Sequence, residues 1–127
     1  MKCSPAQAIH LMHELSVCQG LLKQVSQIAA EHNASKVEKI YLQIGPLAGV
    51  EAELLQAAFP IARRNTLAEQ AEMFIQAMPV QVRCKTCHEI SEARLNNLTC
   101  AACGDWQTEL LSGDELLIER VEMQMKQ

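Results

Sequence analysis

The sequence predicts an α+β fold, in which two helices pack on a three-stranded sheet and a cysteine-rich module interrupts the sheet. Two segments have the apolar spacing of helices and three have the alternation of strands, in the order helix, strand, helix, strand, module, strand. The module contains two CxxC pairs and little regular apolar spacing. At 127 residues, the chain is long enough for one domain with its own core and a small satellite.

The first helix is predicted from Ser4-Pro5-Ala6-Gln7, which places an N-cap serine, a proline at the first helical position and a glutamine three residues after the cap. The pattern ends near His32. On a wheel of about 100° per residue, His10, His13 and Glu14 fall outside the apolar stripe, so we expect all three in one exposed sector. The stripe consists of Leu11, Leu15, Cys18, Leu22, Val25 and Ala29.

The remaining elements complete a body interrupted by the module. Lys36 to Ile44 is predicted as a strand, Glu51 to about Arg64 as a helix and Ala71 to Met78 as a second strand, with Asn65 in the left-handed conformation after the helix. A third strand follows Gly113-Asp114. Residues 1–79 and 113–127 therefore form the predicted body, with 1–11 as an N-terminal extension, and residues 80–112 form the module. Four apolar residues of the last strand share one face: Leu117, Val121, Met123 and Met125.

The module has the spacing of a zinc-ribbon-like site. Cys84 and Cys87 form one CxxC turn, and Cys100 and Cys103 form another after twelve intervening residues. Each turn directs two thiolates at one metal ion, and two turns complete a closed tetrahedron, which is typical of structural zinc. Gly104 permits a tight turn after the second pair. Redox-active or incidental cysteine pairs, and iron in place of zinc, are the alternatives to this interpretation.

Cys84 to His88 also matches CxxCH, the attachment motif of c-type haem. Haem attachment would leave the second CxxC pair without a role and requires an export signal, which the N-terminus lacks. We therefore expect His88 to be exposed or to lie next to the metal ligands without being one of them.

Composition argues against several function classes. The net charge is −4, and residues 80–112 contain three basic and four acidic side chains, which disfavours the alternative of a zinc-ribbon module that binds nucleic acid. The longest apolar runs are far shorter than the roughly 20 residues of a membrane span. No histidine or carboxylate has catalytic-ligand spacing beside the cysteines, so a zinc hydrolase is disfavoured. We expect a cytoplasmic, non-enzymatic protein.

Several motifs together resemble one family. The order of the motifs is similar to that of the HypA/HybF hydrogenase maturation factors, over Met12 to about Met125. The motifs are Met12-His13-Glu14-Leu15-Ser16, Ile44-Gly45-Pro46-Leu47-Ala48-Gly49-Val50, the two CxxC pairs and Gly113-Asp114-Glu115-Leu116. The resemblance implies a nickel metallochaperone with a two-helix, three-strand nickel domain and an inserted zinc domain. It implies delivery of nickel to the large subunit of nickel-iron hydrogenase with a partner GTPase; a homodimer and a role in urease maturation stay open.

The resemblance also implies site residues. The nickel-binding histidine of the family corresponds to His13, with Glu14 beside it, and the zinc ligands correspond to the four cysteines. In the family, the methionine that matches Met12 is the first residue, and its free amine joins the nickel ligands. Here eleven residues precede Met12. Either Met12 is the true start, or nickel relies on side chains such as His10, His13, Glu14 and Glu51.

Overall fold

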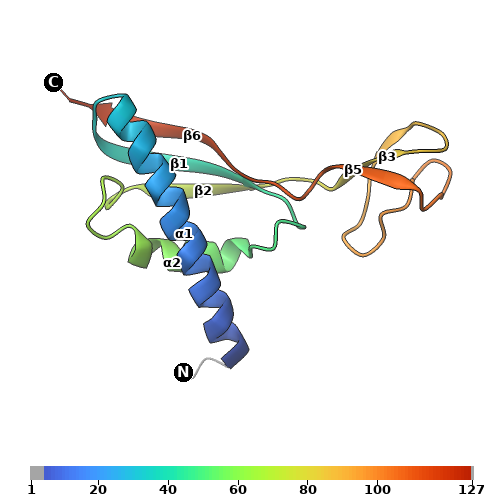
Figure 1. The fold of residues 1–127 in the computed structure, drawn as a ribbon, viewed down its shortest axis with the longest axis horizontal. Helices are drawn as coiled ribbons and strands as arrows, with labels where there is room; N and C mark the ends of the chain where they lie inside the picture. Colours follow the sequence, from blue (N-terminus) through green and yellow to red (C-terminus); the bar gives the residue numbers. More distant parts are fainter. Residues whose placement is uncertain (1–4, 127) are drawn as a thin grey trace. The chain divides into compact units, whose positions relative to one another are not determined.

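A computed structural model describes the backbone of residues 5–126 and the side chains of residues 13–126. Two helices and six strands alternate along the chain (Figure 1), so the predicted α+β class is confirmed. The elements are α1 (Pro5–Glu31), β1 (Ala34–Ile44), α2 (Ala52–Ala62), β2 (Glu72–Ala77), β3 (Gln81–Cys84), β4 (Ile90–Glu92), β5 (Thr108–Ser112) and β6 (Leu116–Met125).

The chain divides into two compact units. The first, called here the helical unit, comprises Met1–Leu42, Val50–Ile75 and Ile118–Gln127. The second, called the cysteine unit, comprises Gln43–Gly49 and Gln76–Leu117. None of the described helices is long and apolar enough to cross a membrane.

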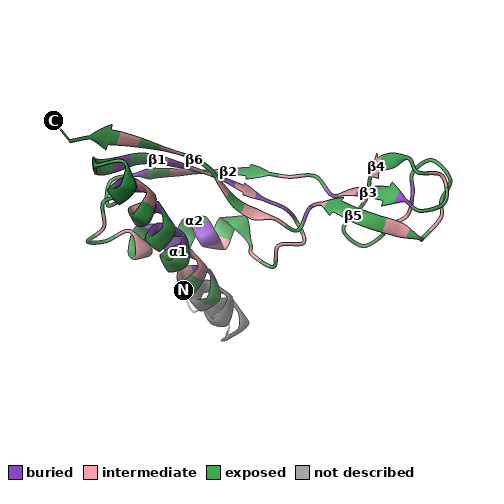
Figure 2. Ribbon diagram, turned by 45° about the horizontal axis from the view of Figure 1, so that its top comes forward, coloured by how far each residue is buried: buried purple, intermediate pink, exposed green. Residues whose placement is uncertain are grey.

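The first sheet has the strand order β2-β1-β6, with the longest strand in the centre. Ile40, Leu42 and Ile44 of β1 are buried and alternate with half-exposed residues, so the predicted apolar face of this strand is confirmed. Both helices run along one side of this sheet (Figure 2), and α1 also packs against α2. The other face of the sheet contains a stacked pair of rings, Tyr41 and Phe74, with centroids 5.0 Å apart.

The last strand is less buried than its pattern predicted. Val121 and Met123 are half-buried, whereas Leu117 and Met125 expose 53% and 49% of their surface. Half-buried positions are spread along β6, at Leu116, Ile118, Val121 and Met123, and no residue of the strand is fully buried. This follows from its place at the edge of the sheet, where one strand alone flanks it.

The buried face of α1 is wider than the predicted stripe. Cys18, Leu22, Val25 and Ala29 are buried as expected, and Leu11 lies outside the described side chains. Glu14, however, is only 1% exposed, so its predicted place in an exposed sector was wrong. On the wheel Glu14 falls about 20° from Val25, and the packing of α2 against α1 extends the covered sector.

The cysteine unit has a small sheet of its own, which the sequence did not reveal. Its order is β4-β3-β5, and β3 pairs antiparallel with both neighbours. Val82 is fully buried opposite Ser91 and Leu110. The strands are three to five residues long, which is too short for alternation to stand out from chance.

Candidate functional site

The four cysteine sulfur atoms converge on one point of the cysteine unit, and all lie within 4.8 Å of one another. The Sγ atoms of Cys84 and Cys103 are 3.5 Å apart, and those of Cys87 and Cys100 are 3.6 Å apart. Sulfur atoms about 2.3 Å from a tetrahedral zinc ion stand about 3.8 Å from each other. The donor set and its spacing therefore fit a zinc ion held by four thiolates.

The two CxxC turns have the same backbone pattern. The amide of His88 donates to the Cys84 carbonyl at 3.0 Å, and the amide of Gly104 donates to the Cys100 carbonyl at 2.9 Å. Both residues have positive φ, 66° for His88 and 77° for Gly104. The tight turn predicted at Gly104 is confirmed. His88 occupies the equivalent position of the first turn, and its exposed side chain is not part of the four-cysteine cluster.

Backbone amides favour the thiolate form of one cysteine in each turn. The amide of Cys87 donates to Cys84 Sγ at 3.4 Å and lowers the pKa of that thiol. The amide of Cys103 donates to Cys100 Sγ at 3.5 Å and lowers the pKa of Cys100 to about 6. Because zinc binds the thiolate and not the thiol, these amides prepare the site for a metal ion.

One carboxylate connects the two turns. The Thr86 hydroxyl, in the first turn, donates to Asp105 Oδ2, just after the second turn, and this hydrogen bond lowers the pKa of Asp105. The carbonyl of Asp105 also accepts from the amide of Cys100 at 2.9 Å. Asp105 is thus a structural residue of the cluster that spacing alone did not identify.

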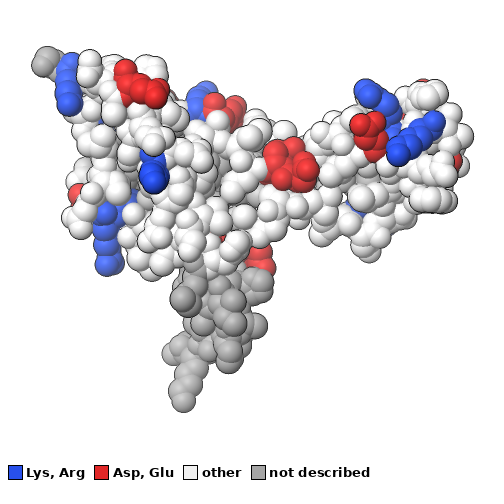
Figure 3. Space-filling view, viewed as in Figure 1, with Lys and Arg blue, Asp and Glu red and all other residues white. Residues whose placement is uncertain are grey.

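The visible face of the cysteine unit has side chains of both charge signs (Figure 3). On the face shown in Figure 3, Lys and Arg side chains alternate with Asp and Glu side chains, and no continuous basic area is visible. A phosphate backbone requires a cluster of cations. This distribution agrees with the charge count of the sequence and disfavours the nucleic-acid alternative.

The second predicted site lies at α1. His13 is exposed, as predicted, and the adjacent Glu14 is buried. The backbone amide of Glu51, at the N-cap of α2, donates to Glu14 Oε1 at 3.2 Å. The fold therefore brings Glu51 to Glu14 across 37 positions of sequence. The side chains of Met12 and His10 lie outside the described residues.

Glu14 has one carboxylate oxygen without a described partner. Its Oε2 atom is buried and forms no hydrogen bond among the described residues. The positive end of the α2 dipole favours an anion at this place. A buried acceptor without a partner is costly, and a bound cation is one way to satisfy it. The residue before Glu14, His13, exposes an imidazole, which is a donor type that suits nickel.

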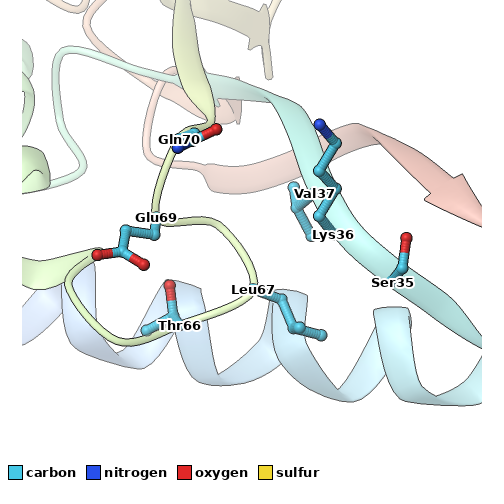
Figure 4. Close-up of a pocket in the computed structure, with 7 residues that line it drawn as sticks. All are labelled: Ser35, Lys36, Val37, Thr66, Leu67, Glu69 and Gln70. Carbon is cyan, nitrogen blue, oxygen red and sulfur yellow. The ribbon is translucent and has the colours of Figure 1, made fainter.

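The described pockets lie elsewhere. A pocket of about 190 Å³ lies beside the start of β1, where the Val37 amide donates to the Leu67 carbonyl at 2.9 Å. In Figure 4 the side chains of Lys36 and Glu69 point in different directions, so its charged groups do not converge on one ligand. The pocket is lined by Ser35, Lys36, Val37, Thr66, Leu67, Glu69 and Gln70.

Comparisons with known proteins all point to one family, HypA. The family described as "Hydrogenase/urease nickel incorporation, metallochaperone, hypA" matches residues 12–123. A hydrogenase maturation factor HypA from Nitrosospira multiformis is 45% identical over 112 residues, which cover 88% of this chain and 97% of the relative. A HypA from Aquifex aeolicus is 35% identical over 114 residues, which cover 90% of this chain and 99% of the relative.

Solved structures show the same fold. The solution structure of the nickel metallochaperone HypA from Helicobacter pylori matches with a TM-score of 0.67 at 23% identity. The match covers 89% of this chain and 98% of the Helicobacter pylori chain. A second HypA solution structure matches with a TM-score of 0.69 at 25% identity, and the match covers 91% of this chain and 98% of the chain in that structure. The chain therefore belongs to the HypA family of nickel metallochaperones that act in hydrogenase maturation.

Proposed function

We propose that this chain carries nickel to nickel-iron hydrogenase during its maturation, with His13 and Glu14 as nickel ligands. The observation that carries the proposal is the buried Oε2 atom of Glu14, which has no hydrogen-bond partner among the described residues and belongs to the residue that follows the exposed His13 in sequence. An imidazole nitrogen and a carboxylate oxygen are harder ligands for nickel than thiolates are. A site with few anchored ligands also permits release, which a carrier requires.

We assign zinc to the four cysteines. A closed shell of four thiolates leaves no position for water or substrate, so its role is structural. The sheet of the cysteine unit has strands of only three to five residues, and structural zinc contributes roughly 10 to 16 kcal/mol of apparent binding energy. In this proposal residues 80–112 form the zinc domain, and residues 1–79 and 113–127 form the nickel domain.

The proposed partners are a nickel-handling GTPase and the hydrogenase large subunit, in the cytoplasm. The family description, which names urease beside hydrogenase, supports a second client of the same kind. A homodimer would present two nickel sites in one particle. The non-enzymatic role follows from the proposed site, because a carrier binds and releases its metal without changing it.

The proposed nickel ligands depend on whether the protein starts at Met1 or at Met12. In the described backbone α1 begins at Pro5, so the amide of His13 lies inside the helix and donates to a carbonyl four residues back. A form that starts at Met12 has a free amine with a pKa of about 7.7 to 8.0 and unpaired first-turn amides. We expect this form to bind nickel more tightly, in planar geometry with a yellow absorption band, than the form that starts at Met1. Equal affinities and identical spectra would exclude the amine as a ligand.

Delivery is tested in a bacterium that contains nickel-iron hydrogenase and lacks its own HypA gene. We expect the wild-type chain to restore nickel in the purified hydrogenase large subunit and His13→Ala to fail. His32→Ala is the matched control, because His32 is also an exposed histidine of the helical unit. Full restoration by His13→Ala, or none by the wild type, would contradict the proposed function.

A further inference from the structure

The sheet of the helical unit has two edge strands, and they differ in how far they are covered. Strand β1 lies between β2 and β6 (Figure 1), so β2 and β6 each have one side without a neighbouring strand. Such an edge presents backbone N–H and C=O groups to which another strand can bind. Residues 34–42, 50–75 and 118–126, which form most of this sheet and its cover, all belong to the helical unit.

Two side chains of α2 occupy the outer edge of β2. Gln56 Nε2 donates to the Met73 carbonyl at 2.8 Å, and Arg63 Nη1 donates to the Ala71 carbonyl, also at 2.8 Å. The guanidinium of Arg63 lies 5.5 Å from the centre of the Phe59 ring, which helps to hold it in place. These carbonyls are therefore blocked, because a further strand could bind them only after both side chains had moved away.

The outer edge of β6 is open. The Gln124 carbonyl points toward β1, where it accepts from the Ser35 hydroxyl at 3.1 Å. Exposure alternates regularly from residue 120 to residue 124, and successive strand residues direct their backbone groups to opposite sides. The backbone groups of Val121, Met123 and Met125 therefore point away from β1. Among the described residues, no side chain binds these groups in the way that α2 binds β2.

The charges on β6 are complementary to a second β6 strand in one register. Arg120, Glu122 and Lys126 are exposed. In an antiparallel pair of β6 strands centred on Val121, Arg120 of each chain lies opposite Glu122 of the other. Centring the pair on Glu122 would oppose two carboxylates, and centring it on Met123 would oppose Arg120 and Lys126. Because opposite charges at facing positions stabilise such a pair and like charges destabilise it, the register centred on Val121 is favoured.

We propose that the open edge of β6 binds a second copy of this chain, so that two three-stranded sheets join into one antiparallel sheet centred on Val121. At the centre, the Val121 amide of each copy donates to the Val121 carbonyl of the other. The arrangement is two-fold and closed, because each β6 edge is used once and α2 blocks each β2 edge. The assembly therefore stops at a dimer, which forms whether or not nickel is bound at His13 and Glu14.

Reversal of charge on β6 tests the interface. The full chain is loaded with zinc, without nickel, and its mass is measured by analytical ultracentrifugation as the concentration rises. We expect dimers of the wild type. Arg120→Glu and Glu122→Arg each place like charges at both facing positions, so each alone should raise the dimer dissociation constant about tenfold. An equal mixture of these two variants restores opposite charges and should form mixed dimers. Lys23→Glu, a charge reversal at an exposed residue of α1, is the control and should match the wild type.

Removal of the side chains that block β2 tests why the assembly stops at a dimer. The double variant Gln56→Ala, Arg63→Ala frees the carbonyls of Ala71 and Met73, so we expect dimers to join through β2 into larger assemblies. Circular dichroism checks that the fold is kept. If the double variant does not fold, Gln56→Ala replaces it, with a change in the same direction expected.

Hydrogen exchange locates the contact, because the Val121 amide should exchange more slowly as dimers form. A wild-type chain that stays monomeric would contradict the proposal and would favour an extended segment of another protein at this edge. A dimer that is unchanged in both charge variants, or that the mixture does not restore, would place the interface on another surface. Variants that remain dimers without Gln56 and Arg63 would contradict the blocking role of α2.

Discussion

Substitution of Cys84 or Cys103 by alanine is expected to eliminate tight zinc binding and to unfold the sheet of the cysteine unit. The four sulfur atoms form one cluster, and three thiolates cannot close its coordination shell. The energy lost is on the order of 10 kcal/mol, more than a sheet with strands of three to five residues can replace. The helical unit should remain folded because it has its own buried side chains, including Leu42, Leu55 and Val25.

Metal analysis and NMR spectra check this prediction. We expect one zinc per wild-type chain and loss of dispersed signals from residues 80–112 in the cysteine variants, while signals of α1 and α2 persist. Lys85→Ala is the control, because Lys85 is an exposed residue within the first CxxC turn. Less than half an equivalent of zinc in the reduced wild-type protein would count against a structural zinc site.

Substitution of His13 by alanine is expected to abolish specific nickel binding with little change in stability. His13 is exposed on α1, and surface substitutions usually change the free energy of unfolding by less than about 0.5 kcal/mol. Calorimetric titration with nickel measures the first effect, and urea denaturation measures the second. His32→Ala should bind nickel as the wild type does. A titration curve unchanged by His13→Ala would remove His13 from the site.

Sequence patterns identified the parts of the molecule that depend on local rules. The apolar residues Cys18, Leu22 and Val25 are buried because helical periodicity alone places them on one face. Asn65 has a φ of 60°, as its tolerance of the left-handed region predicted. The four cysteines converge because CxxC turns have one preferred geometry around a metal.

Features that depend on tertiary packing were not visible in the sequence. The burial of Glu14 is set by the packing of α2 against α1, which a wheel of one helix does not include. The hydrogen bond between Glu51 and Glu14 joins residues 37 positions apart. The role of Asp105 between the two CxxC turns depends on their approach in space. Each of these contacts arises only once separate elements have come together.

X-ray absorption at the nickel edge tests the central claim most directly, because it identifies the atoms bound to nickel. The protein is loaded with one zinc and then with one nickel per chain, and its spectrum is compared with that of His13→Ala. In the wild type we expect nickel bound only by nitrogen and oxygen atoms, with an imidazole contribution, and we expect His13→Ala to retain no specifically bound nickel after the same treatment. A spectrum dominated by nickel–sulfur distances and unchanged in His13→Ala would place nickel on the cysteines and contradict the account.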